Sequence, residues 1–292
     1  YRAEQREPVC RLVALKVLHV GRSESRAEWR FHAERQALAR MQHANIAQIY
    51  DAGRTDEGRP FFAMEFVDGQ PITRWCDERA ATVEQRLELF LRVCAAIQHA
   101  HQRSIVHRDL KPSNVLVRDG DEEALPKIID FGVAKMLTAD EAVEVTLDGA
   151  LIGTPAYMSP EQAAGQAIDT RTDVYALGLL LYELLTGALP FPAELLAGGL
   201  ARATAVIRDH EPRRMISALR AAGDEAALVA ARRSCTEVEL ARRIGGDLEW
   251  IVRRAMAKSP ERRYATANEL IADVERHLGN LPVSARQRET LY

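Results

Sequence analysis

A short charged loop between two apolar segments constrains this chain more than any other feature. Residues 84–103 have the apolar spacing of a helix, and residues 115–117 form an apolar run typical of a strand. Between them, residues 107–114 read His-Arg-Asp-Leu-Lys-Pro-Ser-Asn. This loop contains a possible base, two cations and a possible metal ligand. We therefore expect a functional loop that two packed elements hold in place.

The composition is that of an ordinary globular protein. The chain has 292 residues, of which 47% are hydrophobic and 28% are charged, so it is long enough to bury a sizeable core. The formal net charge of −3 provides no basic field that would attract nucleic acid or a membrane surface. We expect no nucleic-acid partner.

The cysteines and the apolar runs bear on localisation. Four cysteines lie far apart and form no Cys-x-x-Cys pair, which argues against a zinc site and a disulfide scaffold. No signal-peptide pattern opens the sequence, and the most apolar run, residues 174–185, is too short to span a bilayer. We expect a cytoplasmic segment without membrane contact of its own, and an anchor outside these residues stays possible.

The first 67 residues predict mostly sheet with one helix. Residues 9–20, 46–50 and 60–67 have the apolar patterns of strands, and residues 24–42 have helical spacing. Lys16 shares one face of the first of these strands with its apolar neighbours, because alternate side chains point the same way. A lysine there would be costly to bury alone, so it needs an anion.

The pattern changes after residue 68. A helix over 82–103 is followed by short strands at 115–117 and 127–129, and then by an extended loop over 133–161. From residue 170 onward the pattern is helical. The lengthened stretch 193–250 predicts helical packing in preference to a docking surface.

Three segments resemble the signature of the protein kinases: Lys16 in Val-Ala-Leu-Lys-Val-Leu, the loop at 107–114, and Asp130-Phe131-Gly132 after an apolar strand. The segment 153–161, Gly-Thr-Pro-Ala-Tyr-Met-Ser-Pro-Glu, resembles the end of the kinase activation segment, with Ser159 where alanine is usual. The residues in these motifs resemble those of the bacterial branch of the eukaryotic-like (Hanks-type) serine/threonine kinases. The resemblance covers about residues 9 to 278.

The resemblance implies an α+β, bilobal fold. Residues 1–67 would form a small antiparallel β lobe with one helix, residues 68–280 a large and mainly α-helical lobe, and residues 281–292 the start of a linker. The first strand and the glycine-rich loop of such kinases are missing, so the small lobe is incomplete. We expect a fragment of a longer protein, and a protein that truly lacks the loop is the alternative.

The resemblance also implies catalytic roles. Asp109 would accept or orient the proton of the acceptor hydroxyl, and Lys111 would neutralise charge on the γ-phosphate. Asn114 and Asp130 would hold Mg²⁺, with Mn²⁺ as a possible substitute. Thr154 would hydrogen-bond near Asp109.

For ATP, the resemblance places Lys16 on the α- and β-phosphates, with Glu34 as its ion-pair partner. Glu28 is out of phase on the same helix and is the weaker candidate. The remaining residues would form the adenine pocket through side chains or backbone groups: Ala14, Met64, Glu65, Val67 and Leu116.

Further residues would stabilise or regulate the fold. Glu161 would pair with Arg263, and Asp173 would anchor the backbone of the catalytic loop. Arg108 would face the activation loop, where a phosphate on Thr146, or as the second candidate on Thr138, could pair with it and order the loop. Autophosphorylation at Thr146 is therefore expected first.

The sequence thus predicts a protein serine/threonine kinase that transfers the γ-phosphate of ATP to protein hydroxyls. The alternative is a catalytically weak or silent kinase fold that acts as an interaction module. Only the missing glycine-rich loop favours this alternative, because Lys16, Asp109 and Asp130 are all present. A small-molecule phosphotransferase is disfavoured by the complete segment 153–161. The physiological substrate, the activating signal and the oligomeric state stay open.

Overall fold

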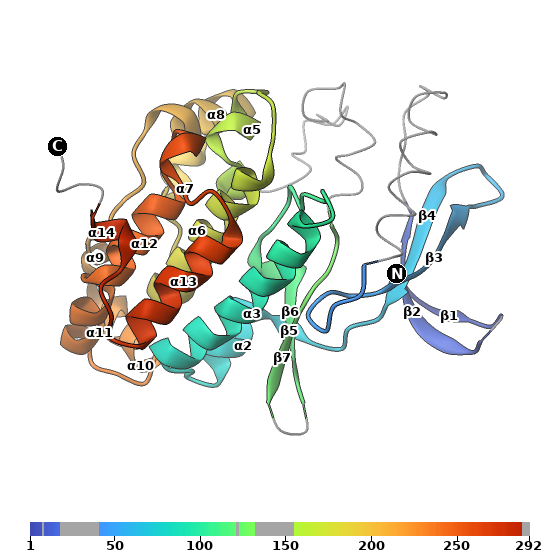
Figure 1. The fold of residues 1–292 in the computed structure, drawn as a ribbon, viewed down its shortest axis with the longest axis horizontal. Helices are drawn as coiled ribbons and strands as arrows, with labels where there is room; N and C mark the ends of the chain where they lie inside the picture. The colour runs from blue at the N-terminus through green and yellow to red at the C-terminus, as the bar shows by residue number, and fades with distance from the viewer. Residues whose placement is uncertain (8, 18–40, 121–122, 132–154, 288–292) are drawn as a thin grey trace.

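The computed structural model describes residues 1–7, 9–17, 41–120, 123–131 and 155–287 (Figure 1). Its fold is α+β, with an antiparallel sheet followed by a mainly helical region. Four strands form the first sheet in the order β1-β2-β4-β3, and each adjacent pair is antiparallel. Their bounds are Arg2–Gln5 for β1, Arg11–Val17 for β2, Ile49–Arg54 for β3 and Pro60–Glu65 for β4.

The register of the first sheet aligns the residues of interest. In β2, Ala14 lies opposite Met64 and Lys16 lies opposite Phe62 of β4. Phe62 and Met64 are both buried, because β4 lies between two other strands and contributes to the core. Lys16 therefore extends from a strand that is fixed against the best-packed part of the sheet.

The strand expected at 46–50 is shifted in the structure, where β3 begins at Ile49. Ile46 instead forms a parallel bridge with Ile128, and the Ala47 amide donates to the Ile128 carbonyl at 2.9 Å. Ile49 and Tyr50 of the expected strand therefore belong to β3, whereas Ile46 and Ala47 contact the last residue of β7 in the second sheet. This bridge connects the first sheet to the strand that leads into Asp130.

A second sheet contains β5 (Gln70–Pro71), β6 (Val115–Asp119) and β7 (Ala124–Ile128) in that order, all antiparallel. It lies between the first sheet and the helices (Figure 1). Helix α2 (Ile72–Glu78), which was not expected from the sequence pattern, follows β5 directly.

Two long helices form the centre of the helical region. Helix α3 (Val83–His101) begins with a capping box, in which Thr82 Oγ1 accepts from the Gln85 amide and Gln85 Oε1 accepts from the Thr82 amide. Helix α6 (Thr170–Thr186) packs against it and is buried along most of its length. Gly187, with φ +71°, ends α6 in the left-handed conformation that favours glycine.

Shorter helices complete the fold and confirm the helical pattern expected after residue 170. Helix α5 begins at the end of the stretch 133–161 that was predicted as an extended loop, because Ser159 and Pro160 start a short helix there. Met215, Leu219, Leu240 and Ile244 show that the stretch 193–250 packs into the main core. The shorter helices are α5 (Pro160–Ala163), α7 (Ala193–Leu196), α8 (Leu200–Asp209), α9 (Met215–Ala221), α10 (Ala226–Ala231), α11 (Glu237–Ile244), α12 (Asp247–Ala255), α13 (Ala267–Leu278) and α14 (Ser284–Gln287).

Part of the segment 281–292, which was expected to start a linker, packs into the core instead. Val283 and Ala285 are buried in the main core. The buried Asp273 carboxylate accepts from the Ser284 amide at 2.7 Å and from the Ala285 amide at 2.9 Å, and so holds the start of α14. Two apolar residues in a short turn give too little periodicity to be recognised from the sequence.

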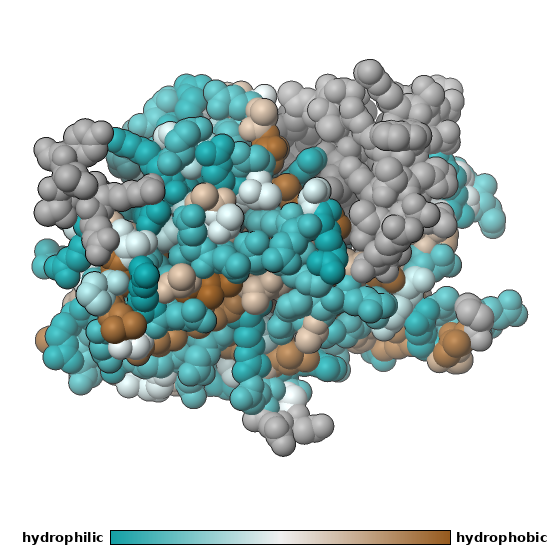
Figure 2. Space-filling model, in the orientation of Figure 1, coloured by the Kyte–Doolittle hydropathy of each residue, from teal (hydrophilic) through white to brown (hydrophobic). Residues whose placement is uncertain are grey.

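The exterior is mainly hydrophilic over the helices on the face drawn in Figure 2, with scattered apolar residues. None of the described helices is both long enough and apolar enough to cross a lipid bilayer.

Candidate active site

Lys16 and Asp130 meet although they are far apart in the sequence. Lys16 Nζ lies 2.9 Å from Asp130 Oδ1, and about a third of each side chain is exposed. Asp130 follows β7 and has φ +56°, which is unusual for a residue other than glycine. Such a conformation persists only where the surrounding structure enforces it, and it commonly marks a functional site.

Asp109 lies in the loop between α3 and β6, beside the two polar residues that follow it. Lys111 Nζ lies 3.0 Å from Asp109 Oδ2. The side-chain nitrogen of Asn114 donates to the Asp109 carbonyl at 2.7 Å and to Asp109 Oδ2 at 3.1 Å. Because this nitrogen is directed at Asp109, Oδ1 of Asn114 is the atom with which the amide could hold a cation.

The backbone of this loop is fixed by Asp173 of α6. The buried Asp173 carboxylate accepts from the His107 amide at 2.7 Å and from the Arg108 amide at 2.9 Å. His101 Nε2 lies 2.8 Å from the same carboxylate. The position of Asp109 therefore depends on a rigid buried helix.

His107 connects the loop to the segment around Asp130. Its Nδ1 accepts from the Asp109 amide at 3.3 Å, and its Nε2 lies 3.2 Å from the Ile129 carbonyl. Its ring lies 4.7 Å from the ring of Phe131. Burial lowers the pKa of His107, so the imidazole is neutral near pH 7 and donates through Nε2.

A direct backbone hydrogen bond also joins the two segments. The Ile129 amide donates to the Asn114 carbonyl at 2.9 Å. Asn114 therefore touches both Asp109 and the residue that precedes Asp130. Side-chain contacts therefore join Lys111 and Asn114 to Asp109, and the backbone hydrogen bond from Ile129 brings Asn114 next to Asp130.

The end of β4 corrects one detail of the expected adenine site. The Glu65 amide donates to the Gln48 carbonyl at 2.8 Å, so this amide is not available to a ligand. The Glu65 side chain accepts from Lys127 Nζ at 2.7 Å and from the Gln48 amide at 3.3 Å. Lys127 is buried and was missed, although it precedes two apolar strand residues in the same way that Lys16 lies among apolar neighbours.

Of the other residues expected around adenine, Ala14 and Met64 are cross-strand partners in β2 and β4. Met64 and Val67 are buried, and Ala14 packs partly against the core. Leu116 lies in the second sheet, opposite Pro71 and Lys127, whereas Ala14 lies in the first.

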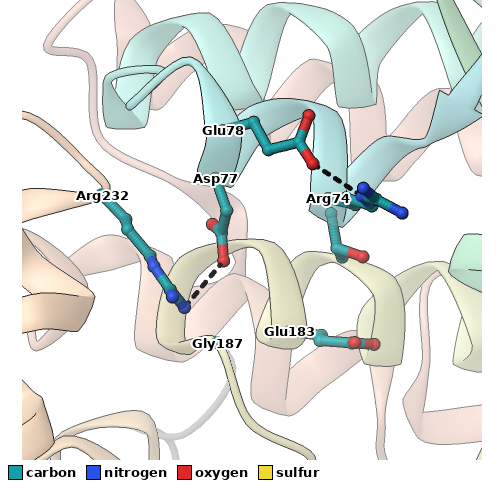
Figure 3. Close-up of a pocket in the computed structure, with 7 residues that line it drawn as sticks. Arg74, Asp77, Glu78, Glu183, Gly187 and Arg232 are labelled. Carbon is teal, nitrogen blue, oxygen red and sulfur yellow. Dashed lines mark hydrogen bonds and ion pairs between the residues drawn. The ribbon is translucent and has the colours of Figure 1, made fainter.

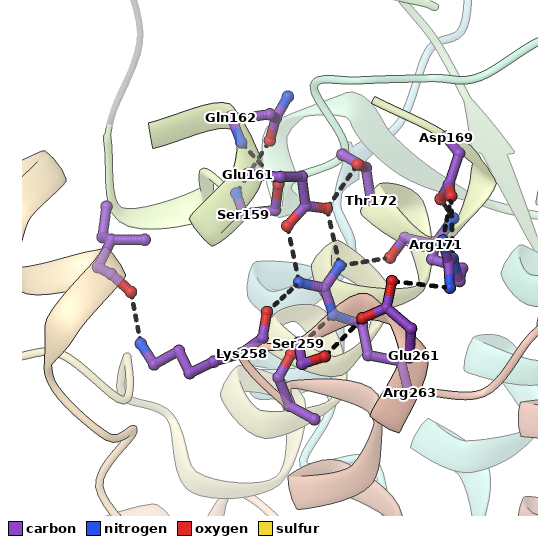
Figure 4. Close-up of polar contacts among 12 residues, drawn as sticks. Ser159, Glu161, Gln162, Asp169, Arg171, Thr172, Lys258, Ser259, Glu261 and Arg263 are labelled. Carbon is purple, nitrogen blue, oxygen red and sulfur yellow. Dashed lines mark hydrogen bonds and ion pairs between the residues drawn. The ribbon is translucent and has the colours of Figure 1, made fainter. Parts of the chain in front are cut away.

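Glu161 and Arg263 form a buried ion pair with two hydrogen bonds, each 2.7 Å long (Figure 4). Thr172 Oγ1 donates to Glu161 at 2.6 Å. Burial alone would raise the pKa of Glu161, but the hydrogen bonds from Arg263 and Thr172 outweigh it and lower the pKa. The pair joins the start of α5 to the segment before α13.

Comparison with known proteins identifies the family. The protein kinase domain matches residues 2–272. This chain belongs to the protein kinase domain family.

Among curated relatives of this kinase domain are three bacterial serine/threonine-protein kinases. It is 40% identical over 256 residues to Pkn1 of Myxococcus xanthus, covering 87% of this chain and 33% of the relative. It is 34% identical over 272 residues to pkn3 of the same organism, covering 91% and 45%. It is also 34% identical over 276 residues to PknB of Mycolicibacterium smegmatis, covering 92% and 39%. The chain thus spans less than half the length of these relatives, and the resemblance drawn from its motifs is confirmed.

Several residues named from the motifs lie outside the described part of the kinase domain. These are Glu34 and its alternative Glu28, and the threonines Thr138, Thr146 and Thr154. Arg108 is described, but the loop that it was expected to face is not.

The donor set of the kinase domain fits a metal ion that is shared with phosphate. Within the described ranges, no three His, Cys, Asp or Glu side chains gather as a metal site. Asn114 and Asp130 offer hard oxygen ligands, and Mg²⁺ is usually held by one or two such side chains together with substrate phosphates.

A cavity of about 430 Å³ between α2 and α6 lies apart from these residues (Figure 3). Its charged lining groups have partners within the protein: Asp77 contacts Arg232 and Arg86, and Glu78 contacts Arg74. Burial raises the pKa of Glu183, which accepts from the Tyr157 hydroxyl at 2.5 Å. None of the residues expected to bind the nucleotide lines this cavity.

Proposed function

We propose that this chain is the catalytic domain of a serine/threonine protein kinase that transfers the γ-phosphate of ATP to protein hydroxyls. The observation that carries the proposal is the ion pair between Lys16 and Asp130, which is linked through Ile129 and Asn114 to Asp109. Three residues that phosphoryl transfer needs are thereby brought together from three segments. The names of the bacterial relatives favour serine and threonine as acceptors.

We propose that residues 1–67 and the region from 68 onward act as two lobes around the nucleotide. The four-stranded sheet and the helices differ in architecture, and residues 65–71 connect them. The packed part of the second lobe extends at least to Ala285.

The proposed ATP site uses backbone and side-chain groups around β2 and the end of β4. Lys16 binds the α- and β-phosphates, and Glu34 is proposed as its partner in the assembled site. The Glu65 carbonyl and the backbone of Val67 bind the adenine edge. The Glu65 amide is left out of this set because it already donates to the Gln48 carbonyl. Met64 closes the rear of the pocket, and Ala14 and Leu116 cover the two faces of the ring.

The proposed chemistry rests on Asp109 and its neighbours. Asp109 orients the acceptor hydroxyl and accepts its proton, while Lys111, 3.0 Å away, neutralises charge on the transferred group. Asn114 and Asp130 hold Mg²⁺, which when bound offsets the negative charge of the phosphates. Thr154 is proposed to hydrogen-bond near Asp109.

Regulation by autophosphorylation is a further part of the proposal. Thr146, and secondarily Thr138, would receive a phosphate that pairs with Arg108. Phosphosite mapping by mass spectrometry after incubation with ATP tests this point. Phosphate found only outside residues 133–154 would contradict it.

The natural full-length protein provides the test of kinase activity. ATP-dependent phosphate incorporation into a generic basic protein is measured for the wild type and for Asp109→Asn and Lys16→Met. We expect both variants to lose incorporation while remaining folded. Equal incorporation by all three proteins would remove the proposed function and leave an interaction module as the better description.

A further inference from the structure

Gln162 connects the activation-segment end to the catalytic loop. Ser159 and Gln162 form a capping box at the start of α5, in which the Gln162 amide donates to Ser159 Oγ at 3.2 Å and the Ser159 amide donates to Gln162 Oε1 at 2.9 Å (Figure 4). The Gln162 side chain has a second contact. Its Nε2 donates to the Arg108 carbonyl at 2.8 Å, across 54 positions of sequence.

The backbone conformation of Arg108 is strained and depends on neighbouring contacts to stabilise it. Arg108 has φ +66°, in the left-handed region that costs free energy for a residue with a Cβ. Asp173 holds its amide and Gln162 holds its carbonyl, so both backbone polar groups of this residue are engaged by distant elements. Asp109 is the next residue, and its direction follows from this backbone conformation.

We propose that Gln162 is a positioning residue for phosphoryl transfer, which acts by fixing the Arg108 carbonyl and thereby the Asp109 carboxylate. This inference rests on the proposed kinase function. It implies that the side-chain amide of Gln162 links the segment 155–163 to the backbone that positions Asp109. Misplacement of a catalytic group by about 1 Å can lower a rate by roughly 100-fold.

A purely structural role for Gln162, as the capping residue of α5, makes different predictions. Glutamate is equally suited to the third position of a capping box, and a carboxylate near a helix N-terminus is favourable. Gln162→Glu therefore keeps an acceptor for the Ser159 amide but places an oxygen against the Arg108 carbonyl. Ser159→Ala does the reverse, because it removes the cap acceptor and leaves the Gln162 amide intact.

Steady-state kinetics of these two variants in the full-length protein separate the roles. We expect Gln162→Glu to lower kcat by about 10- to 100-fold, with the KM for ATP changed by less than about two-fold. Gln162→Met, which removes the donor without adding charge, should also lower kcat. Ser159→Ala should lower Tm and leave kcat near that of the wild type. If Ser159→Ala and Gln162→Glu lower kcat equally, or if Gln162→Glu keeps full activity, the proposal is overturned.

Hydrogen–deuterium exchange gives a second readout that does not depend on activity. We expect Gln162→Glu and Gln162→Met to accelerate exchange at the amides of residues 107–109, whereas Ser159→Ala accelerates exchange only near α5. Unchanged protection of 107–109 in both Gln162 variants would refute the positioning role. An inactive wild type with the expected exchange pattern would instead count against the proposed kinase function alone.

Discussion

Lys16 Nζ lies 2.9 Å from Asp130 Oδ1, and this contact joins the first sheet to the segment that follows β7. Both side chains are about one-third exposed, so the pair contributes little to stability, on the order of 0–1 kcal/mol. We propose that the pair serves function, because both groups would bind charged parts of the nucleotide complex. A variant of this pair should therefore change activity much more than the free energy of unfolding.

Lys16→Met should lower phosphate incorporation by at least about 100-fold, since removing one preorganised charge from an active site costs this much. The midpoint of urea unfolding should remain close to that of the wild type. Arg59→Met is the matched control, because Arg59 pairs with Glu57 at 3.0 Å on an exposed turn. Retained activity in Lys16→Met, or equal losses in both variants, would contradict the assignment.

Arg263→Met should destabilise the protein strongly. It leaves Glu161 buried without the two hydrogen bonds that it accepts from the guanidinium. Leaving a buried charge without its partner costs about 3–5 kcal/mol. Urea unfolding measures this loss, and Arg208→Met, which breaks the exposed pair with Asp209, should cause almost none. Similar unfolding midpoints for the two variants would show that the buried pair is not important for stability.

The free energy of unfolding should decrease as the pH falls below about 6.5. Burial is the main cause that lowers the pKa of four histidines, His43, His99, His107 and His277. A lowered folded-state pKa means that the unfolded chain takes up protons first, below the ordinary value of 6.5. Stability is therefore fully present above this pH and is lost on acidification.

His107→Leu tests the contribution of the most buried of these rings. The variant should be less stable at pH 8, because the hydrogen bonds to Asp109 and Ile129 are lost. Its free energy of unfolding should nevertheless change less steeply than that of the wild type between pH 8 and pH 5, as measured by urea unfolding at several pH values. An unchanged slope would mean that His107 is protonated in the folded protein as readily as in the unfolded chain.

The sequence was most informative where short motifs resemble those of a known family. Lys16, Asp109 and Asp130 were singled out through these motifs, and the structure places them in one connected region. The strand expected at 46–50 begins only at Ile49, because an apolar run does not show where strand pairing starts, and Ile46 bridges to Ile128 outside β3.

Other features lacked any local signal. Gln162 resembles any polar residue at the start of a helix, and its contact with Arg108 depends on the folding of two distant segments. Val283 is buried beside a turn that Asp273 holds from a distance, because its carboxylate accepts from the amides of the next two residues, Ser284 and Ala285. Lys127, by contrast, does have a local signal. The argument used for Lys16 would have identified it, since an unpaired lysine in an apolar strand needs an anion.

Lys127 and Glu65 should be coupled energetically. Lys127 Nζ lies 2.7 Å from Glu65 Oε2, and side-chain exposure is only 11% and 21%. Lys127→Met alone leaves the Glu65 carboxylate with the Gln48 amide as its remaining described donor, so the cost should approach the lower end of the roughly 3–5 kcal/mol expected for a broken buried pair. Glu65→Gln alone leaves the lysine charge poorly compensated.

The double variant Lys127→Met/Glu65→Gln removes both charges, so it should lose less stability than the sum of the two single losses. We expect a coupling free energy of about 0.5–3 kcal/mol from a double-mutant cycle measured by urea unfolding. The exposed pair Arg74–Glu78, with one contact of 2.6 Å, is the control and should show weak coupling. Strict additivity for Lys127 and Glu65 would show that solvent screens the pair, and that the link between β4 and β7 rests on the backbone hydrogen bonds of residues 45–48 instead.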